Sequence, residues 1–219
     1  MRPSLVVFDC DGVSVDSEPI QNRVLAGALT AAELPMSAEE ATAEFAGLPA
    51  VSAVAKAERM LGRALPAGFM AEVDERAAMI FRDELKPVPG VADVVRRVKA
   101  ADIGYCVASS GSWEKMALTL GVTGLLTSFE GRIFTGLEVE RGKPAPDLFL
   151  RAASVSAAAP SDCVVVEDSI FGVRAGRAAG MHVLAYVPEG PVRAHADAGG
   201  QPFRRMTHVP ALIGLEAGG

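Results

Sequence analysis

The stretch that decides the fold is Val6-Val7-Phe8-Asp9-Cys10-Asp11-Gly12-Val13, in which an apolar run ends in two acidic residues and a glycine. An apolar run without alternation is typical of a parallel strand that is covered on both faces. In an open α/β sheet the ligand lies outside the carboxyl ends of the strands, so Asp9 and Asp11 are expected at a binding site. Their two side chains point the same way if the chain stays extended, and Gly12 permits a sharp turn afterwards.

The two neighbouring carboxylates indicate a metal site. Adjacent anions repel each other unless a cation lies between them, and hard oxygen ligands with open positions suit Mg²⁺. We therefore predict Mg²⁺ at Asp9 and Asp11. The alternative is a strand end with two solvated carboxylates, because short motifs also match by chance.

Four apolar runs indicate strands, and helical stretches lie between them. The predicted strands are Leu5 to Phe8, Ile103 to Ala108, Cys163 to Val166 and His182 to Val187. The predicted helices include Trp113 to Leu120, closed by Gly121, and Asp147 to Ala153. Strands that alternate with helices predict an α/β fold with a doubly wound parallel sheet. The composition of residues 190–200 indicates a loop.

A long insertion interrupts this alternation. From about Ser17 to Lys86 there is no convincing strand, only Ala-, Glu- and Met-rich segments with helical spacing. Proline-containing stretches at both edges are of the kind that start and stop helices. We therefore predict two domains, an α/β core of residues 1–15 and 87–219 and a small α-helical domain of residues 16–86.

Composition and charge narrow the partners and the location. The 219 residues are 50% hydrophobic, and 21 Lys and Arg against 27 Asp and Glu give a net charge of −6. Nucleic acid and anionic membranes attract a basic surface, so we expect a small-molecule partner, no nucleic acid and no membrane. The acidic, Ala-rich surface indicates a monomer. The first apolar run is too short for a signal-peptide core, and the three cysteines fit buried reduced thiols, so we expect a cytoplasmic protein.

Two further segments bring groups that can bind phosphate. In Val107-Ala108-Ser109-Ser110-Gly111-Ser112 a strand runs into residues whose hydroxyls and N–H groups can hold phosphoryl oxygens at a helix N-terminus. An ordinary N-cap at Ser112 explains much of the same pattern. In the segment 141–147 a proline-rich turn presents Lys143, which can offset the charge of a phosphate and a carboxylate together. The alternative is an exposed lysine in a loop.

A second acidic pair, Glu167 and Asp168, follows the run Val164-Val165-Val166. It lies at the carboxyl end of another strand, where a second metal carboxylate is needed. Alternatively, Asp168 caps the helix that follows. The four segments together are more specific than any one of them, because they follow in the order acid pair, hydroxyl, lysine, acid pair.

At these positions the sequence resembles the haloacid dehalogenase (HAD) superfamily. The four motifs of that family resemble Asp9-x-Asp11-Gly-Val with Asp16-Ser17-Glu18, then Ser109, Lys143-Pro144, and Glu167-Asp168 with Ser169 and Gly172. The similarity is closest to the β-phosphoglucomutase-like branch of sugar-phosphate phosphatases and mutases, and it extends from residue 9 to 180. The resemblance implies a HAD-like Rossmannoid core, in which residues 16–86 form a mobile helical cap.

The resemblance also implies a phosphoryl-transfer enzyme with a covalent aspartyl-phosphate. Asp9 would be the nucleophile and a Mg²⁺ ligand. Asp11 would protonate the leaving oxygen, later activate water, and bind Mg²⁺ through its backbone carbonyl. Ser109 would hydrogen-bond the phosphoryl oxygens with help from the Ser110 amide. Because expelling a halide needs no proton donor, Asp11 favours phosphate chemistry over dehalogenation.

The remaining roles follow from the same resemblance. Lys143 would bridge the phosphate and Asp9, and the Lys143–Pro144 peptide bond is expected to be cis. Asp168 would ligate Mg²⁺, with Glu167 as a direct or water-mediated partner. Ser14 stands where the family usually has a bulky apolar residue, which puts the packing of this turn in question.

Phosphatase and phosphomutase both fit the resemblance. In the mutase, a cap arginine three residues after a glycine holds the second phosphate of the substrate. The comparable stretch, Gly47-Leu48-Pro49-Ala50, has no cation, which favours a phosphatase of sugar or sugar-acid phosphates. Gln21, Arg23 and this loop, with Gly47, are expected to bind the substrate. A receiver-type phospho-acceptor signalling domain is an alternative from another class, opposed by the insertion, the Asp-x-Asp spacing and the position of the lysine.

Overall fold

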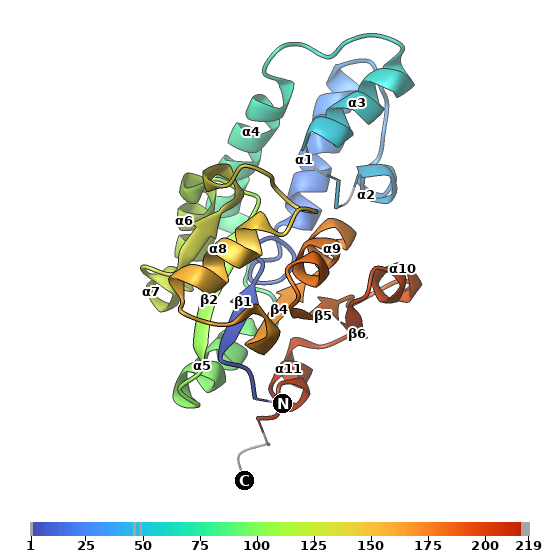
Figure 1. The fold of residues 1–219 in the computed structure, drawn as a ribbon. Helices are drawn as coiled ribbons and strands as arrows, with labels where there is room; N and C mark the ends of the chain where they lie inside the picture. The colour runs from blue at the N-terminus through green and yellow to red at the C-terminus, as the bar shows by residue number, and fades with distance from the viewer. Residues whose placement is uncertain (1, 46, 49, 216–219) are drawn as a thin grey trace. The chain divides into compact units, whose positions relative to one another are not determined.

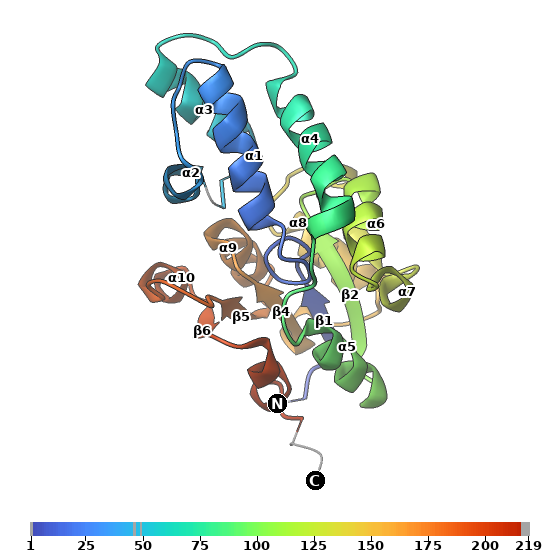
Figure 2. The ribbon, with the colours of Figure 1, turned by 180° about the vertical axis from the view of Figure 1, so that it is seen from behind.

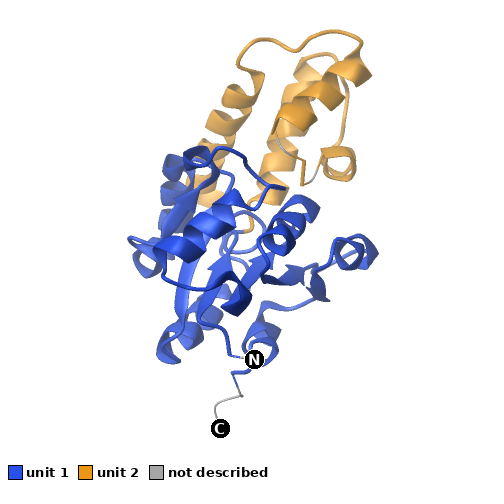
Figure 3. Ribbon diagram, viewed as in Figure 1, with its two compact units in different colours: residues 1–15, 86–219 blue, residues 16–85 orange. Residues whose placement is uncertain are grey.

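The computed structural model describes residues 2–45, 47–48 and 50–215, and the chain divides into two compact units (Figure 3). Unit 1 combines Met1–Val15 with Lys86–Gly219, and unit 2 is Asp16–Leu85. Lys86, which the sequence assigns to the insertion, belongs to unit 1. Val15 and Pro87 form an antiparallel bridge, so the chain leaves unit 1 and returns to it at neighbouring positions.

Unit 1 is built on a parallel sheet with the strand order β3-β2-β1-β4-β5-β6 (Figure 1). Its strands are β1 Leu5–Phe8, β2 Gly104–Ser109, β3 Ile133–Thr135, β4 Cys163–Glu167, β5 His182–Tyr186 and β6 Gln201–Phe203. The chain runs outward from β1 through β2 and β3, then continues on the other side of β1 through β4, β5 and β6. The strand order therefore reverses at β1, and the predicted doubly wound α/β fold is confirmed.

β1 takes the central position because it is apolar throughout. Each of its four residues is at most 1% exposed, and Phe8 lies between Val107 of β2 and Val166 of β4. A strand without polar side chains can be buried on both faces without leaving a polar group unpaired. Its central position brings the next residue, Asp9, to the middle of the carboxyl edge of the sheet.

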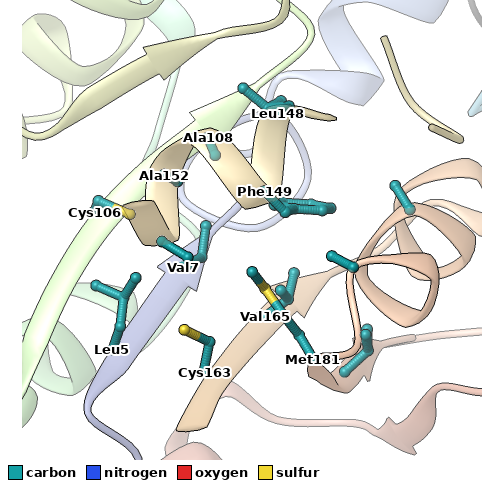
Figure 4. Close-up of a cluster of buried hydrophobic side chains, with 14 of the residues drawn as sticks. Leu5, Val7, Cys106, Ala108, Leu148, Phe149, Ala152, Cys163, Val165 and Met181 are labelled. Carbon is teal, nitrogen blue, oxygen red and sulfur yellow. The ribbon is translucent and has the colours of Figure 1, made fainter. Parts of the chain in front are cut away.

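Helices cover both faces of this sheet (Figures 1 and 2). They are α5 Val91–Ala100, α6 Trp113–Val122, α7 Leu126–Phe129, α8 Asp147–Val155, α9 Ile170–Ala178, α10 Arg193–Asp197 and α11 Val209–Leu212, with the 3₁₀ helices η1 Gly136–Glu138, η2 Pro160–Asp162 and η3 Met206–His208. On one face, α8 and α9 pack in a cluster that includes Val7 and Phe149 (Figure 4). On the other face, the ring of Phe129 from α7 meets the ring of Phe8 edge to face.

The structure contains elements that the sequence did not predict. β3 and β6 have three residues each, which is too short for a periodic signal. The prediction of a loop over residues 190–200 was wrong at α10, because a five-residue helix among glycines and prolines has no detectable pattern. α6 continues through Gly121 to Val122, so Gly121 does not end the helix. Gly124, with a φ of 73°, follows the helix instead.

Unit 2 contains the helices α1 Glu18–Ala31, α2 Ala38–Phe45, α3 Ala50–Leu61 and α4 Phe69–Glu84, and no strand occurs among the residues described there. α1 packs against α2 and α4 and buries Leu29 completely. The guanidinium of Arg23 on α1 pairs with the carboxylate of Glu84 on α4 at 2.6 Å. Over the described ranges of the chain, no helix has both the length and the apolar character needed to cross a membrane.

We predict that the three cysteines do not react in the folded protein. Cys10, Cys106 and Cys163 are free and buried. Burial raises the pKa of the Cys106 thiol to about 12 and that of Cys163 to about 11, and burial with the carboxylates of Asp11 and Asp9 raises the pKa of Cys10. Since only the thiolate attacks disulfide reagents, a thiol-reactive chromogenic disulfide at pH 8 is expected to label three thiols after unfolding and essentially none before it. Rapid labelling of the native protein would contradict the burial of these thiols.

Candidate active site

The predicted site residues of unit 1 gather at the carboxyl edge of the sheet. Asp9 follows β1, Ser109 ends β2 and Glu167 ends β4. Since β2 and β4 are the two neighbours of β1, these residues lie on adjacent strand ends. Lys143 reaches them from the loop before α8, and Ser110 is exposed beside them. The edge therefore combines carboxylates, a hydroxyl and an ammonium group from four separate segments.

The Lys143 ammonium group joins the three strand ends. Its Nζ donates to Asp9 Oδ1 at 2.5 Å, to Glu167 Oε1 at 2.5 Å and to the carbonyl oxygen of Ala108 at 3.3 Å. The Lys143 side chain is 6% exposed, and its Nζ lies 5.0 Å from the ring centroid of Phe149. An ammonium group has three N–H donors, so each of them has an oxygen acceptor here.

Burial and charge shift the pKa values of this group of residues. Burial raises the pKa of Asp9 to about 7; Lys143 opposes this effect, while the carboxylates of Glu167 and Asp11 add to it. For Lys143, burial favours the neutral form, but the carboxylates of Asp9 and Glu167 outweigh it and hold the pKa of the ammonium above its usual value. Two carboxylates thus share one cation, and the site has an excess of negative charge.

A tight turn follows Asp9. The N–H of Gly12 donates to the carbonyl oxygen of Val15 at 2.8 Å, and Gly12 has a φ of 74°, which glycine adopts without strain. Ser14 is fully buried, and its hydroxyl donates to the carbonyl oxygen of Asp9 at 2.7 Å. The small polar residue therefore packs without disturbing the turn, because it gives the Asp9 carbonyl a donor that an apolar side chain lacks.

Asp11 and Cys10 both contact α6. The carboxylate of Asp11 accepts a hydrogen bond from Lys115 Nζ at 2.9 Å, and the thiol of Cys10 lies 3.7 Å from the hydroxyl of Thr119. Lys115 and Thr119 are four residues apart, so they lie on the same face of the helix. Asp9 and Asp11 are close enough to influence each other electrostatically, yet each is paired with a different lysine.

The loop after β2 closes on itself and is held by β3. Ser109 is 2% exposed, and its hydroxyl oxygen accepts from the N–H of Gly111 at 3.1 Å. The hydroxyl of Thr135, the last residue of β3, donates to the carbonyl oxygen of Gly111 at 2.6 Å. Ser112 caps α6 by accepting from the N–H of Lys115 at 3.2 Å, so the N-cap interpretation of Ser112 is confirmed. Ser109 takes no part in this cap.

The two acidic residues at the end of β4, Glu167 and Asp168, have different surroundings. Oε2 of Glu167 accepts from the N–H of Ser169 at 2.7 Å and from its hydroxyl at 3.1 Å, while Oε1 is bound by Lys143. Ser169 is the N-cap of α9, so the alternative in which Asp168 caps this helix was wrong. Asp168 is displaced from that role because Ser169 stands one residue nearer the helix and has the required extended backbone.

Asp168 lies against the turn that follows β1. Its carboxylate fills the space that a Cβ on Gly12 would occupy, which is a second reason for glycine at this position. Nε2 of His195, on α10, donates to the backbone carbonyl oxygen of Asp168 at 2.6 Å. Nδ1 of the same ring is buried and has no hydrogen-bond partner in the part of the chain that the structure covers.

The donors around Gly12 fit Mg²⁺. Within the described residues, no three His, Cys, Asp or Glu side chains form a ready-made metal cluster. Mg²⁺ is, however, commonly bound by one or two carboxylates together with substrate phosphate and water. Asp9 and Asp168 supply two carboxylates, and the backbone carbonyl of Asp11 is a further hard oxygen. Glu167 is the poorest of the four predicted ligands, because protein donors hold both of its oxygens.

The loop that carries Lys143 is tied to α8 by a bidentate ion pair. Nε and Nη2 of Arg141 donate to the two carboxylate oxygens of Asp147 at 3.1 and 3.0 Å. Asp147 is the first residue of α8, so the pair fixes both ends of the loop. The Lys143–Pro144 bond is cis, as expected.

The predicted substrate residues of the insertion belong to unit 2. Gln21 is a half-buried residue of α1, and Gly47 lies between α2 and α3 with a φ of 71°. Pro49, in the same predicted loop, lies outside the described residues. The roles of Gln21, Arg23 and Gly47 in substrate binding stay predictions.

Three contacts at the site involve residues that the sequence did not identify: Lys115, Thr135 and His195. Lys115 stands three residues after the predicted N-cap Ser112, and that spacing places it in the first turn of a helix at the site. This signal was present in the sequence. Thr135 and His195 lie in a three-residue strand and a five-residue helix, which give no periodic signal.

A family model and two curated relatives that match this chain are all named as hydrolases or phosphatases. A family model described as haloacid dehalogenase-like hydrolase matches residues 3–180. The chain is 29% identical to a 6-phosphogluconate phosphatase of Escherichia coli, over 96% of this chain and 95% of the relative. It is 32% identical to hexitol phosphatase A of the same organism, over 84% and 83% of the two chains.

A solved structure shows the same fold with a ligand. A HAD family hydrolase from Deinococcus radiodurans, determined with bound phosphate and sodium, has a TM-score of 0.81 to this chain. The two sequences are 28% identical, and the match covers 99% of this chain and 98% of the other.

We predict that Gly172→Ala destabilises unit 1. A Cβ on Gly172 would overlap the Glu167 carboxylate, which is buried and bound to Lys143. Helix propensity alone favours alanine by about 1 kcal/mol, whereas overpacking costs about 1–3 kcal/mol. Because the overlapped atom belongs to an ion pair that cannot move freely, we expect overpacking to dominate and the free energy of unfolding in urea to fall.

Gly121→Ala is the matched control, since Gly121 is also a helical glycine of unit 1 and, among the residues that the structure describes, its Cβ would meet only Leu126, at 3.9 Å. This variant is expected to be as stable as the natural protein or more so. Equal stability of both variants would mean that the Glu167 carboxylate is not held rigidly.

Proposed function

This chain belongs to the haloacid dehalogenase-like hydrolase family, and on that premise we propose that it is a Mg²⁺-dependent phosphatase of small phosphorylated sugars or sugar acids, working through an aspartyl-phosphate at Asp9. The observation that carries the proposal is the Lys143 ammonium held against Asp9 and Glu167 at the reversal of strand order. A carboxylate attacks phosphorus only when cations neutralise the charge on the phosphoryl oxygens. Lys143 provides such a cation beside the nucleophile.

In the first step, a carboxylate oxygen of Asp9 forms a bond to phosphorus while the bond between phosphorus and the ester oxygen breaks. Asp11 donates its proton to the departing oxygen, so the alcohol leaves neutral. In the second step, Asp11 takes a proton from water, the water oxygen bonds to phosphorus, and the bond to Asp9 breaks. Inorganic phosphate leaves, and both carboxyl groups return to their starting states.

Lys143 and Ser109 hold the phosphoryl group during both steps. The contact of Lys143 with the Ala108 carbonyl is the longest of its three, at 3.3 Å, so this N–H is the one most easily transferred to a phosphoryl oxygen. Within the described residues, the Ser109 hydroxyl accepts one hydrogen bond through its oxygen, from the N–H of Gly111, and in this proposal its proton serves the ligand. The amide of Ser110 adds a donor at the N-terminus of α6.

Mg²⁺ would be held by the carboxylates of Asp9 and Asp168 and by the backbone carbonyl of Asp11. When bound, the ion neutralises negative charge on the phosphoryl oxygens. Glu167 keeps Lys143 in place, because its second oxygen is anchored by Ser169. The excess of carboxylate over ammonium at this edge supports the assignment of a divalent cation.

Unit 2 acts in this proposal as a cap that recognises the part of the substrate away from phosphorus. Gln21, Arg23 and the loop containing Gly47 are the proposed contacts. Relatives named as 6-phosphogluconate phosphatase and hexitol phosphatase support a sugar-acid or sugar-alcohol phosphate as the substrate class. The family assignment to hydrolases opposes the receiver-type signalling alternative.

We predict that Asp9→Asn abolishes phosphate release. The amide lacks the anionic oxygen that attacks phosphorus, so kcat is expected to fall by at least about 10³-fold. The effect is measured as the rate of phosphate release from a sugar phosphate. Chelation of Mg²⁺ is expected to lower this rate similarly, and adding Mg²⁺ back should restore it.

Asp93→Asn, which changes an exposed carboxylate of α5, is the control and should leave activity unchanged. Undiminished turnover of Asp9→Asn, or of the chelated enzyme, would refute the proposed mechanism.

We also predict net hydrolysis and no isomerisation. The stretch 47–50 has no cation to bind a second phosphate, so a hexose 1-phosphate with a bisphosphate primer should give only free phosphate. A panel of sugar, sugar-acid and sugar-alcohol phosphates should include the best substrate. An isomeric sugar phosphate formed without loss of phosphate would show that the protein is a mutase.

A further inference from the structure

A further ion pair lies at the site, between the proposed acid–base group Asp11 and Lys115, a residue outside the four motifs. Lys115 Nζ lies 2.9 Å from Asp11 Oδ2, and the two side chains are 27% and 24% exposed. Lys115 stands in the first turn of α6, where Ser112 fixes its backbone N–H. The backbone from which the Lys115 side chain extends is therefore fixed, three residues after the N-cap of α6.

The surroundings of Gly111 show that this pair belongs to the site. A Cβ on Gly111 would lie 3.5 Å from Cδ of Lys115, 3.6 Å from the Ser109 hydroxyl and 4.0 Å from Asp11 Oδ2. These three side chains thus converge on one point beside the loop that binds phosphate. Thr135 holds the carbonyl of Gly111 from the other side, so the loop cannot easily move away.

We propose that Lys115 is a positioning residue that holds the Asp11 carboxyl group in the orientation needed for proton transfer to the leaving oxygen. This inference rests on the proposed function. Asp11 immediately precedes Gly12, which has a left-handed backbone conformation, and its side chain is partly open to water. The hydrogen bond from Lys115 Nζ to Oδ2 restricts the rotation of this carboxyl group.

Two features favour positioning over a purely structural role. An ion pair between partly exposed groups contributes little to folding stability. By contrast, proton transfer by a well-placed side chain accelerates a reaction by roughly 10²–10⁴-fold and depends steeply on geometry. Removing Lys115 should therefore change catalysis far more than stability.

The test compares leaving groups. An alkyl phosphate such as a sugar phosphate needs a proton on its departing oxygen, whereas p-nitrophenyl phosphate releases a stable anion. The ratio kcat/KM reports the steps up to loss of the leaving group, before water enters. We expect Lys115→Met to lower kcat/KM for the sugar phosphate by about 10- to 100-fold and for p-nitrophenyl phosphate by less than about threefold.

Three matched variants separate the possible causes. Lys115→Arg keeps a cation and is expected to restore most of the selectivity between the two substrates. Lys99→Met removes an exposed lysine at the end of α5 and should change nothing. In an Asp11→Asn background, Lys115→Met should have no further effect, because a residue that acts through Asp11 has nothing left to position.

Equal losses with both substrates would overturn the proposal, as would full additivity with Asp11→Asn or an increase in KM alone. Thermal unfolding checks that Lys115→Met is folded; if it is not, Lys115→Gln provides the same comparison with a polar side chain. Asp9→Asn and Mg²⁺ chelation test the proposed function separately. A failed prediction for Lys115 can therefore be told apart from a failure of the proposed function.

Discussion

Two buried carboxylates, those of Asp9 and Glu167, share the single ammonium group of Lys143 at 2.5 Å each. Burying charges costs free energy unless each is paired and hydrogen-bonded, and removing one partner of such a group leaves an uncompensated charge. All three N–H donors of Lys143 and both oxygens of Glu167 are engaged, and the longest of these contacts is that of Lys143 with the Ala108 carbonyl at 3.3 Å. In the proposed mechanism, the second carboxylate oxygen of Asp9 is the one that meets the metal ion or the phosphoryl group.

The sheet makes this arrangement possible. Because the strand order reverses at β1, the ends of β2 and β4 flank Asp9. Ser109 and Glu167 are the last residues of these two strands, so the sheet itself places them beside Asp9. Lys143 comes from a loop instead, and the Arg141–Asp147 pair fixes that loop to α8. Apolar strands thus determine where the charges lie, while local hydrogen bonds determine how they point.

The central strands and the four motifs could be predicted because each has a local signal. Leu5 to Phe8 is apolar throughout, and Asp9, Ser109 and Glu167 follow such runs directly. The contacts of Thr135 and His195 could not be predicted, because their short elements exist only through tertiary packing. The fit of Ser14 depends on a single bond to the Asp9 carbonyl, and the position of Asp168 depends on its close approach to Gly12. These contacts depend on which residues lie close together in the folded chain, and the hydrophobic periodicity of the sequence does not predict them.

Asp9 and Asp11 are chemically identical, yet the proposed mechanism needs one to attack and the other to transfer protons. Enzymes separate such roles by giving like groups different environments. Here Asp9 is buried beside an ammonium that it shares with Glu167, whereas Asp11 is partly open to water beside a lysine of its own on α6. The two carboxylates, two residues apart at one strand end, therefore pair with two different lysines, Lys143 in the loop before α8 and Lys115 on α6. In the proposed mechanism, the different roles of the two carboxylates follow from this difference in partners.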